Sequence, residues 1–293
     1  MDDDVRQRLA SSFGPVAEAY DRGRPSFPTE AASWLVGREA ATVLELGAGT
    51  GKLTRQLVAL GHDVHASEPD AEMLGVLRRR LPDIPTSESG AEEIPLPDRS
   101  VDVVVAAQAF HWFDHERALP EIARVLRPGG ALALAWNLRD ERIPWVRKLG
   151  RLLANADLHH RVQDATAALV RSELFGFVDE HTFTFWQDVN RESIVDLAAS
   201  RSYVATLDDD AREAKLAEVL DLYDDYGRGM DGMRLPYTCE CFRAVVVERP
   251  GQEDDTADEG DDHPPTDPPT DPPAGPSGPS DGTDTDMLLI DFR

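Results

Sequence analysis

The chain has 293 residues, 41% of them hydrophobic, which is enough for one sizeable buried core followed by a tail. Its 55 acidic residues outnumber its 30 basic ones, and a formal net charge of −25 argues against nucleic acid as the main substrate because phosphate backbones repel an acidic body. No apolar run approaches the roughly 18 residues of a membrane span, and the opening MDDDVRQRL lacks a signal region, so we expect a cytoplasmic protein with a small-molecule substrate and no membrane partner.

Strand-like and helix-like segments alternate from Thr42 to Asn137. In chain order we predict a strand at 42–46, a helix at 53–60, a strand at 63–68, a helix at 71–81, a short strand at 84–88, a buried strand at 101–108, a helix at 115–125 and a strand at 130–137. This alternation is typical of an α/β fold with a doubly wound, mostly parallel sheet and helices on both faces. Ligands of such sheets bind outside the carboxyl ends of the strands.

Helices dominate the chain after Asn137. We predict helices at 144–156 and 164–174, a strand at 181–187, two helices between Arg191 and Gly227, and a last strand at 241–247. These elements complete a seven-stranded sheet with a helical insertion before the last strand. We expect the insertion, at about residues 190–230, to form a cap over the ligand crevice.

The C-terminal segment differs from the rest in composition. Residues 250–293 are rich in Pro, Asp and Thr, and such a segment cannot bury enough apolar surface to offset its loss of conformational entropy. We therefore divide the chain into a folded domain at 1–249 and an acidic, disordered tail at 250–293. The tail ends in the apolar stretch MLLIDFR, which leaves a protein partner open.

The stretch VLELGAGTGKLT, residues 43–54, joins a buried strand to a helix through three alternate glycines, Gly47, Gly49 and Gly51. A phosphate-binding loop needs a glycine and a Ser or Thr where this chain has Leu46 and Leu53. The dinucleotide fingerprint needs its third glycine where this chain has Lys52. The spacing favours a nucleoside-like cofactor without phosphates, and a dinucleotide stays open.

Two cysteines occur in the sequence, Cys239 and Cys241, and the alternation of a strand puts both on one face. Two thiols are too few for a zinc site, so we predict no metal. Cysteine is among the most buried residue types, and we expect a pair of core thiols.

Four blocks in order resemble the class I S-adenosylmethionine-dependent methyltransferases, over roughly residues 10 to 248. The blocks are AEAYDRGRPSFP, the glycine loop, AQAFHWFD and RVLRPGGALALAWN. Within that superfamily the chain looks like the small-molecule group that includes trans-aconitate-type methyltransferases, although Phe27 stands where a Tyr is common. The resemblance implies S-adenosylmethionine as the cofactor and an N-terminal lid at residues 1–40.

The resemblance also implies a set of cofactor contacts around the glycine loop. Glu68 ends the second strand, where a carboxylate can accept hydrogen bonds from both ribose hydroxyls. Glu45 resembles the family acid that holds the ammonium group of the cofactor, and Met73 would lie against the adenine ring. The complete set is Tyr20, Arg24, Glu45, Gly47, Gly49, Gly51, Glu68, Asp70, Met73, Ala91, Glu92 and Gln108.

Candidates for the methyl acceptor's side follow the fourth predicted strand. His111 is the catalytic candidate, either to orient an acceptor carboxylate or to act as general base for a hydroxyl. The substrate candidates are Trp112, Phe113, Arg201 and Tyr203. We expect methyl transfer to an oxygen or nitrogen atom of a small molecule. Two alternatives stay open, a non-catalytic binding protein on the same scaffold and a nicotinamide-dependent oxidoreductase.

Overall fold

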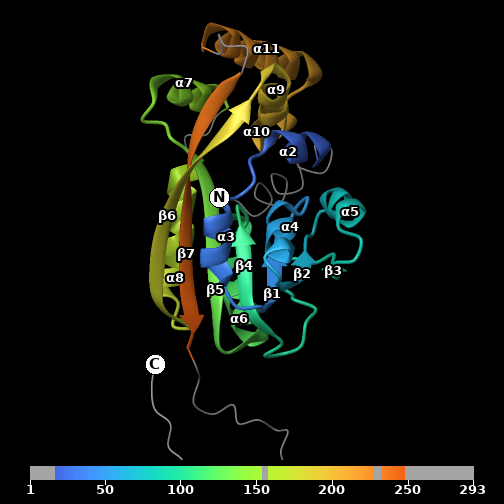
Figure 1. Ribbon diagram of the computed structural model, residues 1–293, viewed down its shortest axis with the longest axis vertical. Coiled ribbons are helices and arrows are strands. Elements are labelled where there is room, and N and C mark those ends of the chain that lie inside the picture. The colour runs from blue at the N-terminus through green and yellow to red at the C-terminus, as the bar shows by residue number, and fades with distance from the viewer. Residues whose placement is uncertain (1–16, 154–157, 227–231, 248–293) are drawn as a thin grey trace, which may run out of the picture. The chain divides into compact units, whose positions relative to one another are not determined.

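One sheet organises the part of the chain that the computed structural model describes, which is residues 17–153, 158–226 and 232–247. The strands are β1 (Thr42–Leu46), β2 (Asp63–Ser67), β3 (Thr86–Ser87), β4 (Val101–Ala107), β5 (Leu126–Arg139), β6 (Phe175–Val189) and β7 (Met233–Val246). They lie in the order β3-β2-β1-β4-β5-β7-β6 (Figure 1). Neighbours from β3 to β5 are parallel, and β7 is antiparallel to β5 and β6. The predicted seven-stranded, mostly parallel α/β sheet is confirmed.

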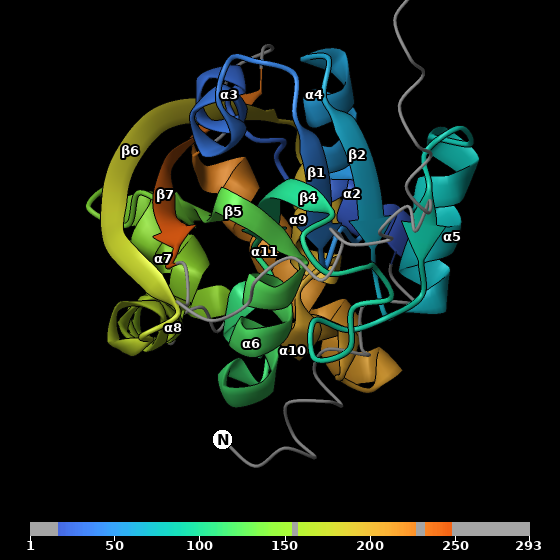
Figure 2. The ribbon, with the colours of Figure 1, turned by 90° about the horizontal axis from the view of Figure 1, so that it is seen from below.

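Helices cover both faces of the sheet because alternate strand residues point to opposite sides. The covering helices are α3 (Thr29–Val36), α4 (Lys52–Ala59), α5 (Ala71–Arg80), α6 (His115–Val125) and α8 (Leu158–Arg171). Val43 and Ala133 pack with α3 and α4 on one face, and Leu44 and Leu132 pack with α6 and α8 on the other. Figure 2 shows these two pairs of helices on opposite sides of the strands.

A layer of helices lies at the carboxyl ends of the central strands, at the top of Figure 1. It consists of α2 (Ala17–Gly23), α7 (Pro144–Leu152), α9 (Arg191–Ala199), α10 (Ser202–Ala205) and α11 (Asp209–Tyr226). Strands β6 and β7 extend into this layer, where Leu235 and Tyr237 pack with Leu197 of α9 and Leu222 of α11. The insertion between β6 and β7 is therefore fixed to the sheet through a shared core.

Several element boundaries differ from the sequence predictions. The helix predicted at 164–174 begins at Leu158, because Leu158 and three further apolar residues form one face at helical spacing. The strand predicted at 181–187 spans Phe175–Val189, because it pairs with β7 along most of its length. Three helices replace the two predicted between Arg191 and Gly227, and β7 begins at Met233. The helix predicted at 144–156 ends at Leu152, and residues 154–157 lie outside the described part.

The two cysteines lie close together on β7. Both are fully buried, Cys239 Sγ is 3.7 Å from Cys241 Sγ, and both belong to the core that α3 and α4 cover. The prediction of paired core thiols is confirmed. Within the described ranges, no group of three or more His, Cys, Asp or Glu side chains is placed to hold a metal ion.

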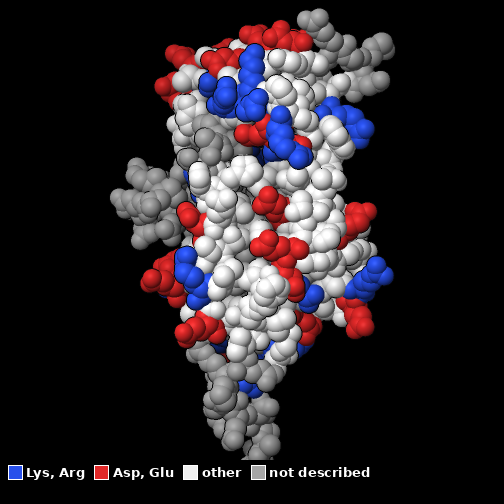
Figure 3. All heavy atoms as spheres, turned by 90° about the vertical axis from the view of Figure 1, so that its left-hand side faces the viewer, with Lys and Arg blue, Asp and Glu red and all other residues white. Residues whose placement is uncertain are grey.

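The surface and the ends of the chain bear on three further expectations. No helix in the described residues is long and apolar enough to cross a membrane. On the face shown in Figure 3, basic side chains lie in small groups interspersed with acidic ones. The tail predicted at 250–293 and the first 16 residues of the predicted lid lie outside the described residues, so these two remain predictions.

Candidate active site

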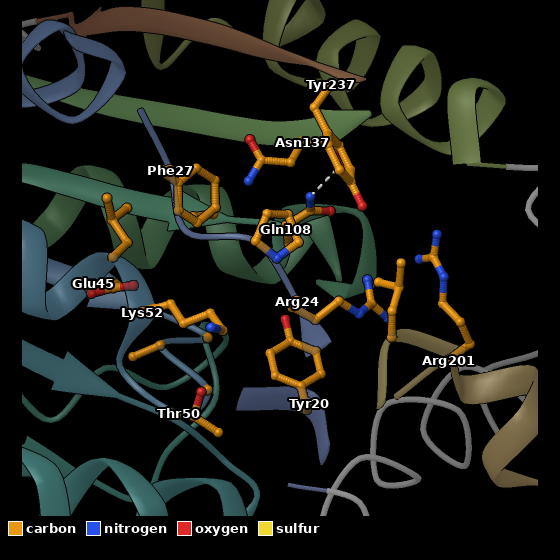
Figure 4. Close-up of a pocket in the computed structure, with 17 residues that line it drawn as sticks. Tyr20, Arg24, Phe27, Glu45, Thr50, Lys52, Gln108, Asn137, Arg201 and Tyr237 are labelled. Carbon is orange, nitrogen blue, oxygen red and sulfur yellow. Dashed lines mark hydrogen bonds between the residues drawn. The ribbon is translucent and has the colours of Figure 1, made fainter. Parts of the chain in front are cut away.

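A pocket lies at the carboxyl ends of β1, β4 and β5, beneath the helical layer (Figure 4). The space inside it, counted out to the open mouth, is about 600 Å³. The predicted site residues in its lining are Tyr20, Arg24, Glu45, Gly47, Gly49, Gln108 and Arg201. These residues come from separate segments of the chain, and the fold brings them together.

The loop after β1 requires glycine at alternate positions. The φ angles of Gly47, Gly49 and Gly51 are 66°, 59° and 82°, in the left-handed region that side chains disfavour. A Cβ on Gly47 would lie 2.4 Å from the Cβ of Ala109, and a Cβ on Gly51 would lie 2.9 Å from the Cγ of Leu77. Because Gly47 and Gly49 line the pocket, a ligand can approach main-chain atoms of the loop directly.

Two buried carboxylates flank this loop. Glu45 is 2% exposed, and its Oε2 accepts a hydrogen bond from Thr54 Oγ1 at 2.6 Å. Glu68 is 8% exposed, and its oxygens accept hydrogen bonds from the backbone N–H groups of Gly49, at 2.9 Å, and Asp70, at 3.0 Å. Burial raises the pKa of Glu45 to about 8 and that of Glu68 to about 7, against the lowering effect of these hydrogen bonds. A ligand with a positive charge would favour the ionised form of both.

The remaining predicted cofactor residues lie outside the pocket lining. They are Gly51, Glu68, Asp70, Met73, Ala91 and Glu92. Asp70 caps α5, because its Oδ1 accepts two backbone N–H groups of the first turn, each at 3.0 Å. Met73 packs with Tyr20, and Glu92 Oε1 accepts a hydrogen bond from the backbone N–H of Asp114 at 2.8 Å. Each of these three side chains has a structural contact, and its role toward a cofactor remains a prediction.

Helix α2 connects the glycine loop to the insertion. Asp21, which is buried, accepts a hydrogen bond from Thr50 Oγ1 at 2.9 Å. Arg22 donates from Nε and Nη2 to the two carboxylate oxygens of Asp196 on α9, at 2.8 and 3.0 Å. Arg24 Nε donates to Ser200 Oγ at 2.9 Å. The described part of the predicted lid therefore contacts both sides of the pocket.

We expect Gly23→Ala to separate α2 from α9. A Cβ on Gly23 would lie 2.3 Å from the backbone nitrogen of Leu197 and 2.4 Å from the carbonyl carbon of Asp196, so backbone must move. The free energy of unfolding should fall by roughly 1 to 3 kcal/mol in denaturant titrations. Gly75→Ala in α5 is the control, because its Cβ would meet nothing closer than 3.6 Å and alanine favours a helix. Equal stabilities of the two variants would contradict this contact.

The acceptor candidates His111, Trp112, Phe113 and Tyr203 do not line this pocket. His111 Nδ1 accepts a hydrogen bond from Trp136 Nε1 at 3.1 Å. Burial, followed by the charges of Arg161 and His115, lowers the pKa of His111 to about 3. A neutral imidazole that accepts at Nδ1 carries its proton on Nε2, so His111 can donate a hydrogen bond there but is poorly suited to take up a proton. Of the two predicted roles, orientation suits this geometry better than general-base catalysis.

Comparison with known proteins identifies the family. Residues 44–134 match the family model described as a methyltransferase domain. An uncharacterized methyltransferase of Mycobacterium tuberculosis is 45% identical over 244 residues, which is 83% of this chain and 98% of that protein. The chain belongs to the class I S-adenosylmethionine-dependent methyltransferases.

Two further comparisons extend this methyltransferase assignment. A malonyl-[acyl-carrier protein] O-methyltransferase of Pectobacterium atrosepticum is 33% identical over 177 residues, 58% of this chain and 70% of that protein. The solved structure of a putative type II methyltransferase from Anaeromyxobacter dehalogenans matches with a TM-score of 0.59 and 26% identity, over 76% of this chain and 97% of that one. The open alternatives of a non-catalytic binding protein and of a nicotinamide-dependent oxidoreductase are therefore set aside.

The methyltransferase uses S-adenosylmethionine, and its pocket suits that cofactor. The cofactor has a sulfonium, an ammonium group, a carboxylate and a ribose, and no phosphate. The buried Glu45 in the lining can pair with the ammonium group, which favours its ionised form, and the absence of side chains at Gly47 and Gly49 allows a ligand to approach the backbone closely. The absence of a phosphate agrees with the spacing around Lys52, which fits no phosphate-binding loop.

Some lining residues of the methyltransferase pocket were not predicted, among them Lys52, Asn137 and Tyr237. Lys52 lines the pocket, and burial lowers its pKa. Asn137 ends a predicted buried strand at the ligand edge of the sheet, and a polar residue there is a signal that could have identified it. Tyr237 lies on an antiparallel strand about 100 residues further along, and no local pattern marks it.

Proposed function

We propose that this methyltransferase transfers a methyl group to an oxygen atom of a small molecule, with nitrogen as the second candidate. The observation that carries the proposal is the pocket itself, which has the Glu45 carboxylate and the glycine loop at one end and Arg24, Arg201 and Tyr237 at the other (Figure 4). The resemblance of AEAYDRGRPSFP and AQAFHWFD to the trans-aconitate-type group supports a small acceptor. The relative from Pectobacterium atrosepticum, an O-methyltransferase by name, supports oxygen.

The residues around the glycine loop would hold the cofactor. S-adenosylmethionine supplies a methyl group on a sulfonium, and its sulfur leaves as a neutral thioether. Glu45 would bind the ammonium group, Glu68 would accept hydrogen bonds from the ribose hydroxyls, and the backbone near Gly47 and Gly49 would contact the methionyl part. Lys52 in the lining can pair with the carboxylate of the cofactor.

The other end of the pocket would align the acceptor. In an in-line displacement the protein positions the nucleophile behind the methyl group and excludes water. No histidine is among the described residues that line the pocket, and His111 is poorly suited to take up a proton. An oxygen that is already ionised, such as a carboxylate, needs no general base. An acidic acceptor therefore agrees best with this lining.

Calorimetry tests the cofactor assignment. S-adenosylhomocysteine, the demethylated cofactor, should bind the full chain in the micromolar range, and NAD should bind about 100-fold more weakly or worse because the loop lacks a phosphate-binding pattern. Tighter binding of NAD would overturn the proposal. A panel of small acids, phenols and amines, assayed for methylated product, then tests the acceptor atom, and a preference for amines would replace oxygen by nitrogen.

A further inference from the structure

Three arginines from distant parts of the chain lie close together at one end of the pocket, where Arg24 and Arg201 belong to the lining and Arg139 lies behind it. Arg24 follows α2, Arg139 ends β5, and Arg201 lies between α9 and α10. Figure 4 shows Arg24 and Arg201 on the side of the pocket opposite Glu45. Arg139 pairs with Tyr237 across the antiparallel strands, and Tyr237 lines the pocket. In a chain of formal charge −25, this is a local concentration of positive charge beside a small-molecule site.

Two of these cations lack the partners that burial normally requires. Arg139 is 3% exposed, and none of its three side-chain nitrogens makes a hydrogen bond. Arg201 is partly exposed as a residue, but its Nε is buried without a hydrogen-bond acceptor. Arg24, by contrast, donates to the Oγ and the carbonyl oxygen of Ser200 at 2.9 and 3.0 Å. Burying a guanidinium nitrogen without a hydrogen-bond acceptor lowers the stability of the folded protein. A ligand that accepts hydrogen bonds from Arg139 and Arg201 would remove this cost.

Positive charge exceeds negative charge around these three arginines. Burial lowers the pKa of Arg201 well below its ordinary value, and the charges of Arg24 and Arg139 lower it further. Burial also lowers the pKa of Arg139, while the Tyr237 hydroxyl and the Glu141 carboxylate act in the opposite direction. Glu141 acts on Arg139, whereas the largest charge effects on Arg201 come from two further guanidinium groups, so the cluster keeps an excess of positive charge.

We propose that Arg139 and Arg201, together with the hydroxyl of Tyr237, bind a carboxylate of the methyl acceptor. This inference rests on the proposed methyl transfer and names the acceptor as a small organic acid. Guanidinium groups match the two oxygens of a carboxylate, and a phenol can donate a third hydrogen bond. The cofactor brings one carboxylate of its own, for which Lys52 and Arg24 are in the lining, so the second pair of cations is left for the acceptor.

The bound carboxylate would anchor the acceptor and would not be the group that is methylated. Its lone pairs are engaged by guanidinium donors, which makes it a poor nucleophile. The methyl group would go to another oxygen of the same molecule. As the new C–O bond forms and the C–S bond breaks, the sulfonium loses its positive charge and the ionised acceptor oxygen loses its negative charge, so no proton has to be removed.

The anchoring site can be tested with succinate and its neutral analogue succinamide. The full chain is saturated with S-adenosylhomocysteine, the ionic strength is held constant with sodium chloride, and the melting temperature is followed as each probe is titrated. Succinate should raise the melting temperature and succinamide should not. In Arg139→Met and in Arg201→Met the dissociation constant for succinate should rise at least about tenfold.

A surface arginine on the same loop is the matched control. Arg142 has an 83% exposed side chain paired with Asp140, and Arg142→Met should leave the succinate response unchanged. Without any ligand, Arg139→Met should melt at a higher temperature than the unmodified chain, because a buried unpaired charge has been removed. A purely structural Arg139 would give a lower melting temperature instead.

Four results would overturn the inference. The first is a rise in melting temperature with succinamide equal to that with succinate, and the second is a rise with succinate that both arginine variants retain. The third is a rise with succinate that is seen without S-adenosylhomocysteine and disappears when S-adenosylhomocysteine saturates the protein. The fourth is a larger rise with inorganic phosphate than with succinate. The third would assign the cluster to the carboxylate of the cofactor, and the fourth to a phosphorylated acceptor. Failure of S-adenosylhomocysteine to bind would instead contradict the proposed function itself.

Discussion

Gly47→Ala is expected to abolish measurable binding of S-adenosylhomocysteine and to lower the free energy of unfolding by roughly 2 to 4 kcal/mol. Two effects add at this position. The φ of 66° is unfavourable for alanine, and the new Cβ would lie 2.4 Å from the Cβ of Ala109. If either the loop after β1 or the segment after β4 moved to relieve this contact, the wall of the pocket would change. Denaturant titration and calorimetry measure the two losses separately.

A substitution at a second glycine, Gly61, distinguishes the effect of the unfavourable φ angle from the effect of the steric clash. Gly61 has a φ of 92°, and a Cβ there would meet nothing within 4 Å. Gly61→Ala should therefore lose only about 1 kcal/mol and keep normal cofactor affinity. If Gly47→Ala were no less stable than Gly61→Ala and bound S-adenosylhomocysteine normally, the loop would not be the close-approach surface described above.

The sequence predicted those parts of the site that are local in the chain. A buried strand followed by alternate glycines identifies Gly47 and Gly49 without knowledge of the fold, and Glu45, two residues before Gly47, follows from the resemblance to the family. The parallel sheet was equally predictable, because strand and helix alternate with clear periodicity as far as Asn137. The roles of individual residues toward the cofactor were carried by resemblance, and they remain predictions.

The acceptor end of the pocket could not be predicted, because tertiary pairing creates it. Arg139 lies opposite Tyr237 only through the antiparallel register of β5 and β7. Arg201 reaches the same place because α9 packs on the core shared with β7. The position of His111 after β4 was predictable, but the hydrogen bond that its Nδ1 accepts from the indole N–H of Trp136 was not. Each of these facts depends on contacts between residues more than 20 positions apart.

Glu45→Gln should stabilise the protein without ligand, and increasingly so as the pH rises. In the unfolded chain the carboxyl of Glu45 titrates near its ordinary pKa of 4.5, whereas burial raises the pKa in the folded protein to about 8. A raised pKa contributes stability that is fully present below about pH 4.5 and is lost as the pH rises through 8. Glutamine does not titrate, so its advantage should be small near pH 5 and reach roughly 3 to 5 kcal/mol near pH 9.

The same substitution should weaken binding of the cofactor. Glu45 would then be a residue that lowers stability in the free protein and contributes to binding. An ammonium group beside the carboxylate favours its ionised form, so binding of S-adenosylhomocysteine near pH 7 should release protons, visible as a dependence of the binding enthalpy on the buffer. Glu45→Gln should reduce that release and raise the dissociation constant at least about tenfold. Exposed Glu72 is the control, and Glu72→Gln should change neither quantity. A stability difference between the unmodified chain and Glu45→Gln that is constant from pH 5 to pH 9 would show that Glu45 does not titrate as a buried acid.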